Sequence, residues 1–228
     1  MIIALLIGRK GSQGFPKKNL YPVMGRPLAA YSMIAAKESH YVDKVYVSTD
    51  DEKIMELAKY HDVEIIVRPQ ALATDTALGE DAFTHGYNLI KSQLSKQGKK
   101  IELIVLLFCN VATILADTID EAIEILRNKT TIDSAVTVSR YNMWSPLRAR
   151  KIKDDGLLHS FVPFETFKDV NELTCDRDSQ GDVWFADMGV SVVRPHCLEQ
   201  IKNGLLPQKW MGQKIYPIKQ WGGCDVDY

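Results

Sequence analysis

Ile2-Ile3-Ala4-Leu5-Leu6-Ile7 leads directly into GRKGSQGFPKKN at residues 8–19. Six apolar residues without polar alternation are typical of a strand that is buried on both faces, at the centre of a parallel sheet. A flexible cationic loop at the carboxyl end of such a strand is where an open α/β sheet binds a polyphosphate. The glycines of this loop are Gly8, Gly11 and Gly14, and its basic residues are Arg9, Lys10, Lys17 and Lys18.

This loop matches neither of the two common phosphate-binding fingerprints. A Walker A loop needs a glycine where Gln13 stands, and the dinucleotide pattern G-x-G-x-x-G needs a glycine where Lys10 stands. Composition alone therefore leaves two interpretations open. The loop binds phosphate, or it is a surface loop whose lysines are only solvated.

Further along the chain, apolar runs alternate with amphipathic segments. A helix is predicted to about residue 37, and strands are predicted at 42–47, 63–67, 101–107 and 134–138. This alternation predicts an α/β fold with right-handed crossovers and a mainly parallel central sheet flanked by helices. Three more helices are predicted from apolar faces made of Ile54, Leu57 and Ala58; of Phe83, Tyr87, Ile90 and Leu94; and of Ile119, Ala122, Ile123 and Leu126.

Two of these helices have candidate N-terminal caps. Ser48-Thr49-Asp50 precedes the helix of Ile54, and Glu52 stands three residues after Thr49, as in a capping box. Asp117 is the candidate cap of the helix that precedes residue 134. Both helices are therefore predicted to begin with a side chain that accepts a backbone N–H.

The regular alternation ends near Arg140. Beyond it, strand-like pieces at 148–152, 183–193 and 214–218 are separated by loops that contain Pro and Gly. Because 228 residues suit one α/β core, residues 1–228 are predicted to form a single domain. Residues 141–182, approximately, are expected to be a lobe that covers a ligand site or makes a dimer contact.

The charge balance argues against two classes of partner. Lys and Arg number 28 against 29 Asp and Glu, which gives a net charge of −1. A general binder of nucleic acid or of membrane surfaces carries an excess of positive charge. We therefore expect no nucleic-acid partner and no membrane partner, and any basic patch to be local.

The cysteines and the apolar segments indicate a cytoplasmic protein. Cys109, Cys175, Cys197 and Cys224 lie far apart and form no C-x-x-C pair, which suits reduced thiols and offers no zinc site. The first apolar run is too short for a signal peptide, and its basic residues follow it. No stretch approaches the ~20 apolar residues that span a bilayer.

Five short motifs, in this order, resemble the CMP-sialic acid synthetases, which are also called acylneuraminate cytidylyltransferases. The loop at 8–19 resembles the family signature ARxGSKGxPxKN, and the segments at 25–28 (GRPL) and 47–50 (VSTD) resemble the two motifs that follow it. Arg68-Pro69 and the block at 72–76 (LATDT) resemble the family's R-P-x-x-L-A-x-D-x-A. The resemblance is dense to about residue 81.

This resemblance implies a GT-A or Rossmann-like nucleotidyltransferase domain with a small cover or dimerisation lobe. It also implies a Mg²⁺-dependent enzyme that transfers CMP from CTP to a sialic-acid-like nonulosonic acid, releases pyrophosphate and forms a homodimer. In that case Arg9 and Lys18 hold the triphosphate and are catalytic, with help from backbone amides, and Asn19 bonds the base or ribose. The whole implied nucleotide-binding set is Arg9, Gly11, Ser12, Gln13, Lys18, Asn19 and Arg68.

Asp225 and Asp227 are separated by one residue. In an extended segment their carboxylates point the same way and can share one hard cation, although this spacing also fits two solvated aspartates. They resemble the family's D-I-D magnesium motif. The resemblance thus implies that both residues bind Mg²⁺ and are catalytic.

The chain departs from the family pattern at two places. Gln13 replaces the lysine of G-S-K-G, which removes a cation near the leaving pyrophosphate unless Lys10 or Lys17 replaces it. Residues 106–113, LLFCNVAT, stand where the family has L-L-Q-P-T-S-P. Asn110 in this segment either contacts the sugar and the metal or only caps a turn.

The carboxylate of a sugar acid calls for arginine, whose planar guanidinium donates two hydrogen bonds to it. Arg148 stands where the family has the lysine of H-P-L-K. Arg177 precedes residues 187–189 (DMG) by about the distance that separates the family's sugar-binding arginine from its N-G-A motif. Arg177 has neighbouring aspartates, so a surface ion pair is its second interpretation. The expected sugar-binding set is Asn110, Arg148 and Arg177. The aromatic residues that either line the sugar pocket or a dimer contact, or belong to the core, are Phe161, Phe164, Phe167, Trp184 and Phe185.

Two other functions stay open at this point. The same fold could activate Kdo, or a hexose phosphate with another nucleotide. Gln13 and the altered segment 108–113 also fit a regulator that binds a nucleotide without turnover.

Overall fold

The computed structural model of the chain describes residues 1–11, 14–176, 181–223 and 225–226. Its main element is a seven-stranded sheet in the order β11-β7-β10-β6-β1-β4-β5. Within this sheet β10 runs antiparallel to its neighbours, and the other pairs are parallel, so the predicted mainly parallel sheet is confirmed. The strands are β1 (Ile2–Ile7), β4 (Lys44–Thr49), β5 (Glu64–Val67), β6 (Leu103–Phe108), β7 (Ser134–Arg140), β10 (Trp184–Val193) and β11 (Ile215–Gln220).

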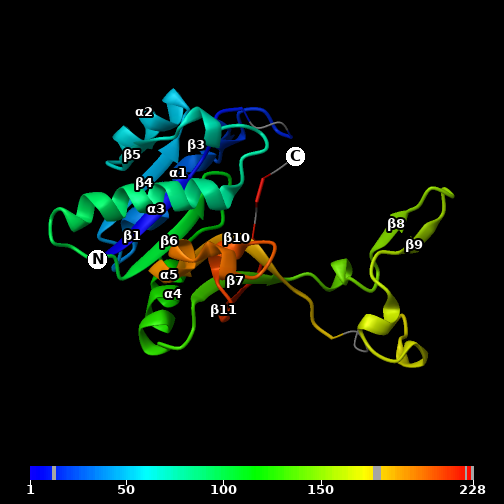
Figure 1. The fold of residues 1–228 in the computed structure, drawn as a ribbon. Coiled ribbons are helices and arrows are strands. Elements are labelled where there is room, and N and C mark those ends of the chain that lie inside the picture. Colours follow the sequence, from blue (N-terminus) through cyan, green and yellow to red (C-terminus); the bar gives the residue numbers. More distant parts are fainter. Residues whose placement is uncertain (12–13, 177–180, 224, 227–228) are drawn as a thin grey trace.

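Helices cover both faces of the sheet, as Figure 1 shows. Three helices pack on one face through residues such as Met33 and Ile119, and two pack on the other through residues such as Phe83 and Leu198. The first group is α1 (Leu28–Glu38), α2 (Glu52–Tyr60) and α4 (Ala116–Asn128), and the second is α3 (Gly79–Ser95) and α5 (Pro195–Glu199). A short ribbon of β2 (Pro22–Val23) and β3 (Arg26–Pro27) precedes α1.

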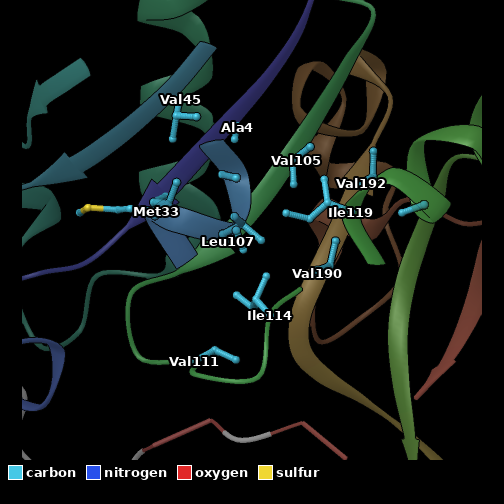
Figure 2. Packing of buried hydrophobic residues seen from close by; sticks show 14 of the residues in the cluster. Ala4, Met33, Val45, Val105, Leu107, Val111, Ile114, Ile119, Val190 and Val192 are labelled. Atoms are coloured by element: carbon cyan, nitrogen blue, oxygen red, sulfur yellow. The ribbon is translucent and has the colours of Figure 1, made fainter. Parts of the chain in front are cut away.

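Strand β1 is buried along its whole length, as its unbroken apolar run predicts. Because side chains alternate along a strand, Ile2, Ala4 and Leu6 enter the cluster under α1, α2 and α4, whereas Ile3, Leu5 and Ile7 enter the cluster under α3. Figure 2 shows Ala4 in the first cluster, with Met33 and Ile119 from the helices that cover it. The helix on the opposite face lies close to the strand, since a Cβ at Gly86 of α3 would come within 2.9 Å of Leu5.

The predicted helix caps are wrong in detail. The N-cap of α2 is Asp51, whose side chain accepts a hydrogen bond from the N–H of Lys53. Thr49 cannot cap because β4 continues through it, and its hydroxyl accepts the N–H of Asp51 instead. Helix α4 begins after Leu115 without a side-chain cap. Asp117 lies in its first turn, where a carboxylate still favours the helix dipole.

The described residues of the stretch 141–182, which are 141–176 and 181–182, form an arm that projects from the body of the molecule (Figure 1). The strand-like piece expected at 148–152 is part of a hairpin of β8 (Arg150–Ile152) and β9 (Leu158–Ser160). The remainder of the described arm consists of single 3₁₀ turns and loops. Many of its large apolar side chains are exposed, and these include Met143, Trp144, Ile152, Leu157, Leu158 and Phe161.

The described helices include none that is both long enough and apolar enough to cross a lipid bilayer. The longest, α3, has 17 residues and an amphipathic sequence. Its buried apolar side chains face the sheet, and its charged side chains, apart from the buried Glu80, face solvent, as in a surface helix of a globular domain.

Candidate active site

A cavity of about 370 Å³ opens at the carboxyl ends of β1 and β6. From β1 the strand order proceeds to β4 and then to β5 on one side, whereas the next strand in the chain, β6, pairs with the other edge of β1. Open α/β sheets bind ligands at such a reversal of strand order. This cleft cavity is lined by Ile7, Gly8, Arg9, Gly14, Lys18, Asn19, Arg68, Leu72, Ala77, Leu78, Gly79, Phe108 and Asn110. It therefore brings together Arg9, Lys18, Asn19, Arg68 and Asn110 from the sequence-based candidates.

Gly8 is required where β1 passes into the loop. A Cβ at this position would come within 2.7 Å of the Sγ and 2.8 Å of the Cβ of Cys109, which follows β6. The two strand ends can approach this closely because residue 8 has no side chain. The loop and the end of β6 are consequently two walls of one cavity.

Hydrogen bonds from other segments fix the path of the loop. The N–H of Lys10 donates to Oδ1 of Asp50 at 2.8 Å, and the amide of Asn19 donates to the carbonyl of Arg9 at 3.3 Å. Asn19, expected to bond a base or ribose, thus also holds the loop backbone. Gly11 has φ +77, a conformation that favours glycine. Ser12 and Gln13 lie outside the described residues.

Arg9 joins the loop to the segment on the opposite side of the cleft cavity. Its guanidinium donates to the carbonyl of Thr74 at 2.6 Å and to the carboxylate of Asp75 at 2.7 Å. Both partners are in the LATDT block. The sequence showed this block only as a family motif. In the structure, its ion pair with Arg9 holds it against the loop beside the cavity.

Arg68 supplies a positive charge at the base of the cavity. Its side chain is buried and donates to the carbonyl of Ser48 at 2.6 Å and to the Ser48 hydroxyl at 3.3 Å. Burial lowers the pKa of Arg68. An arginine nevertheless stays protonated near neutral pH.

The electrostatics of the cleft cavity favour an anion. Its described lining residues include Arg9, Lys18 and Arg68 and no carboxylate. Helix α3 begins in the same wall, at Leu78 and Gly79, and the free N–H groups of a helix N-terminus add positive potential. The cavity is therefore suited to several phosphate groups of one ligand.

Asp225 lies at the edge of this cavity, next to Asn110. Residues Val111 and Asp225 form an antiparallel bridge, and the N–H of Val226 donates to the carbonyl of Asn110 at 3.0 Å. The side-chain amide of Asn110 donates to the carboxylate of Asp225 and to the carbonyl of Val226. Asp225 therefore lies beside a residue that lines the cleft cavity, whereas Asp227 lies outside the described residues.

A second cavity, of about 380 Å³, which we call the aromatic cavity, is lined in part by Asp225. The hydrogen bond between Asn110 and Asp225 joins its lining to that of the cleft cavity, and we call this contact the junction of the two cavities. Phe185, one of five aromatic candidates, lines it, whereas Phe161, Phe164 and Phe167 are in the arm and Trp184 lies under Lys219. The core assignment is wrong for Phe161 and Phe167, which are exposed on the arm, and for Phe185, which is partly exposed near the start of β10, where it lines this cavity. The full lining is Tyr141, Trp144, Phe185, Ala186, Asp187, Met188, Gly223 and Asp225.

Arg148 does not reach the cleft cavity. It lies at the root of the arm, where it lines a cavity of about 310 Å³ with Arg140 and Tyr141. Tyr141 lines both this cavity and the aromatic cavity, so Arg148 lies near the aromatic cavity. Arg177, the other expected sugar-binding arginine, lies outside the described residues.

Asp187 is part of β10 and lines the aromatic cavity, but the sequence alone assigned it no role. A signal was available in the alternation of polar residues along a strand that is otherwise apolar. Thr137 and Ser139 in β7 are fully buried, and buried hydroxyls need partners. Both donate to Asp187.

Comparison with known sequences gives one family and several relatives. A family model described as Cytidylyltransferase matches residues 3–154. An N-acylneuraminate cytidylyltransferase of Escherichia coli O18:K1:H7 is 35% identical over 39% of this chain and 21% of its own length, and a pseudaminic acid cytidylyltransferase of Campylobacter jejuni is 35% identical over 40% of each chain. A CMP-N,N'-diacetyllegionaminic acid synthase of Legionella pneumophila is 30% identical over 78% of this chain and 72% of its own length. The chain thus matches less than half the length of the first two relatives.

Comparison with solved structures supports the fold. A CMP:2-keto-3-deoxy-manno-octonic acid synthetase in complex with CTP matches 99% of this chain and 92% of its own, with a TM-score of 0.67 and 14% identity. A 4-diphosphocytidyl-2C-methyl-D-erythritol synthase of Anaerococcus prevotii matches 100% of this chain and 90% of its own, with a TM-score of 0.61 and 12% identity. The predicted nucleotidyltransferase fold is confirmed.

Proposed function

The chain belongs to the cytidylyltransferase family, and from this premise we propose that it transfers CMP from CTP to a nonulosonic acid and releases pyrophosphate. The named relatives act on acids of this class: N-acylneuraminic, pseudaminic and legionaminic acid. One observation carries the proposal. Asn110 lines the cationic cleft cavity together with loop residues and bonds Asp225, so Asp225 lies beside that cavity.

The residues of the cleft cavity would bind the triphosphate of CTP. Arg9, Lys18 and Arg68 together supply three positive charges, and the α3 N-terminus adds oriented N–H groups. Charge that develops on the leaving pyrophosphate is stabilised by donors that are already in place. In this proposal Arg9 exchanges its bond to Asp75 for a bond to phosphate, because a doubly charged phosphate group is the stronger acceptor.

The groups around Asp225 fit a hard divalent cation such as Mg²⁺. The carboxylate of Asp225 supplies oxygen ligands at the junction of the two cavities, where it accepts a hydrogen bond from the amide N–H₂ of Asn110. Mg²⁺ commonly takes one or two carboxylates and completes its shell with phosphate and water. When bound, the ion would neutralise charge at the α-phosphate.

The aromatic cavity is the proposed site of the sugar acid. It shares Asp225 with the junction, so an acceptor hydroxyl there would face the α-phosphate of a nucleotide in the cleft cavity. Tyr141, Trp144 and Phe185 offer flat apolar surfaces to a sugar ring. Arg148 and Arg140, in the cavity that also contains Tyr141, are the proposed partners of the sugar carboxylate.

The arm is the proposed dimer contact. Its exposed apolar side chains, such as Trp144, Leu158 and Phe161, are not covered by the part of the chain that the structure describes, and large exposed apolar patches commonly mark protein interfaces. We propose that a second copy of the chain covers them in a homodimer. Residues 1–228 would then be one nucleotidyltransferase domain whose arm makes the contact.

The test is a matrix of pyrophosphate release. CTP, UTP, GTP and ATP are each incubated with Mg²⁺ and with N-acetylneuraminic, pseudaminic, legionaminic and 2-keto-3-deoxyoctonic acids. We expect release with CTP and one of the three nine-carbon acids, and no release after EDTA is added. Release with a purine nucleotide, or with none of the combinations, would contradict the proposal.

A second candidate substrate is the eight-carbon keto acid. The matched solved structure is named for that sugar, although 14% identity supports the fold alone. Release with 2-keto-3-deoxyoctonic acid and not with nine-carbon acids would favour this candidate. Nucleotide binding without release across the whole matrix would favour a regulator.

A further inference from the structure

Asp187 is a buried carboxylate that accepts hydrogen bonds from four groups. Its Oδ1 accepts the hydroxyl of Thr137 at 2.6 Å and the N–H of Gly189 at 3.1 Å. Its Oδ2 accepts the hydroxyl of Ser139 at 2.5 Å and the amide of Gln220 at 2.7 Å. Only 8% of the residue is exposed. Four donors on two oxygens fix both the position and the rotation of the carboxylate.

The backbone of β10 is irregular at the place where it presents this carboxylate. Its pairing with β7 shifts register between Ala186 and Ser191, and Met188 has φ 58. Gly189 must lack a side chain, because a Cβ there would come within 2.9 Å of the Thr137 hydroxyl. Strain of this kind persists where the surrounding structure requires it, which is common near functional sites.

The hydrogen-bond network of Asp187 reaches the segment that carries Asp225. The Oγ of Ser139 accepts the N–H of Gly223 at 3.0 Å, and Tyr141 donates to the Gly223 carbonyl at 3.3 Å. Gly223 lies directly on Asp187, since a Cβ at position 223 would come within 2.5 Å of the Asp187 Cβ. Asp225 follows two residues later.

The segment around Asp225 is therefore held from two sides. Gly223 is bound to the Asp187 network, and the backbone of Val226 is bound to Asn110 beside β6. A carboxylate between two such anchors has little freedom to move away from the junction of the cavities. Groups that orient a metal ligand in this way affect metal affinity without touching the ion.

We propose that Asp187, acting through Ser139 and Gly223, is a positioning residue that aims Asp225 at the divalent ion bound with the nucleotide. This inference rests on the proposed function and adds a role for residues that contact neither nucleotide nor metal. Asp187→Asn would replace one carboxylate oxygen with an amide N–H₂ group. This group is a donor and cannot accept hydrogen bonds from the groups that now donate to that oxygen. The network would then lose at least one bond.

The chain offers matched controls for this role. Thr137 and Ser139 lie in the same strand and both donate to Asp187, but only the Ser139 hydroxyl accepts the Gly223 N–H. After Thr137→Val, Oδ1 of Asp187 keeps the N–H of Gly189. Asp133 is a second control, because its side chain accepts the N–H groups of Gln213 and Lys214 just before β11, at the far end of β7 and β11.

The experiment measures Mn²⁺ binding by electron paramagnetic resonance in the presence of CTP, together with CTP binding in EDTA. Ser139→Ala and Asp187→Asn are expected to raise the Mn²⁺ Kd about 10-fold or more, and to leave CTP binding in EDTA unchanged. Thr137→Val and Asp133→Asn are expected to lower the melting temperature but to keep the wild-type Mn²⁺ Kd.

Three results would overturn the inference. One is a wild-type Mn²⁺ Kd in Ser139→Ala, and another is an equal loss of Mn²⁺ binding in Thr137→Val. These two leave the proposed function intact. If the wild-type protein with CTP binds no Mn²⁺ at all, the metal-dependent function fails and this inference fails with it. Should Asp187→Asn not fold, the pair Ser139→Ala and Thr137→Val decides the question.

Discussion

Lys18 is the lysine of the loop whose side chain lines the cleft cavity, whereas its neighbour Lys17 does not line it. We predict that Lys18→Gln raises the Kd for CTP about 10-fold or more, because a charge-assisted bond to phosphate contributes about 1.5–3 kcal/mol. Lys17→Gln is the matched control and is expected to have little effect. Isothermal titration calorimetry measures both. Equal losses in the two variants would mean that only the net charge of the loop matters.

The described cysteines differ in their expected reactivity. Burial raises the pKa of the Cys109 thiol to about 12, and burial together with Asp133 raises the pKa of Cys197 to about 12. Cys175 is exposed. Because the thiolate is the reactive form, iodoacetamide at pH 8 should label Cys175 first and should reach Cys109 and Cys197 only after unfolding. Peptide mapping by mass spectrometry distinguishes the sites, and prompt labelling of Cys109 in the native protein would contradict the buried position.

Single residues of the site were predictable where a motif carried them. Arg9, Lys18 and Arg68 were identified from the sequence and meet in one cavity. Asn110 was identified too, although its observed partner is Asp225 and the sequence left its role open. Asp187 was missed because its importance depends on which strands lie beside β10. The polar alternation of Thr137 and Ser139 indicates that β7 has a buried polar partner, but it does not identify that partner as Asp187.

At the level of elements, Asp120 joins α4 to the segment that follows α1. Its carboxylate accepts the hydroxyl of Ser39 at 2.5 Å, the N–H of His40 at 3.1 Å and a ring nitrogen of His40 at 2.7 Å. Burial alone raises the pKa of Asp120, but the bonds from Ser39 and His40 outweigh it, so that the pKa lies below its usual value. The ionised carboxylate therefore stabilises the folded protein.

The sign of this shift predicts a pH dependence. A lowered folded-state pKa gives stability that is present above the unfolded value of about 3.9, and that is lost as the pH falls through the folded value. Asp120→Asn should reduce the free energy of unfolding by about 1–3 kcal/mol at pH 7, and its stability should change less than that of the wild type from about pH 4 downward. Urea unfolding at pH 7, 4 and 3 measures this. Parallel pH profiles of the two proteins would disprove it.

Elements were predictable to the extent that they carry their own periodicity. The apolar runs predicted β1, β6 and β7 to within about two residues of their observed limits, and the predicted apolar faces lie within α3 and α4. The cap of α2 was wrong because a strand end and a helix start compete for the same few residues. The cap of α4 was wrong because the helix begins at Ala116, one residue before Asp117. The antiparallel direction of β10 was not predicted, since direction depends on the path of the chain through the arm.

At the level of the whole molecule, the arm is expected to hold two copies together. Leu158→Glu places a charge on a side chain that is 70% exposed in the single chain. If the arm is the dimer contact, this change should convert a dimer to a monomer in analytical ultracentrifugation, because an unpaired charge is costly in a buried interface. Lys151→Glu, on the same hairpin, tests whether any added charge has this effect. A wild-type protein that sediments as a monomer would contradict the proposal.

The central place of β1 has a consequence for biosynthesis. One edge of β1 pairs with β4, but the other edge pairs with β6, which is not synthesised until residues 103–108. Ribosomes add about 5–20 residues per second, so about 100 residues of delay leave that edge uncovered for about 5–20 s. An uncovered apolar edge pairs readily with other chains. The strand that ends at the cleft cavity is thus also a segment of the nascent chain that is exposed to wrong pairing until β6 has been made.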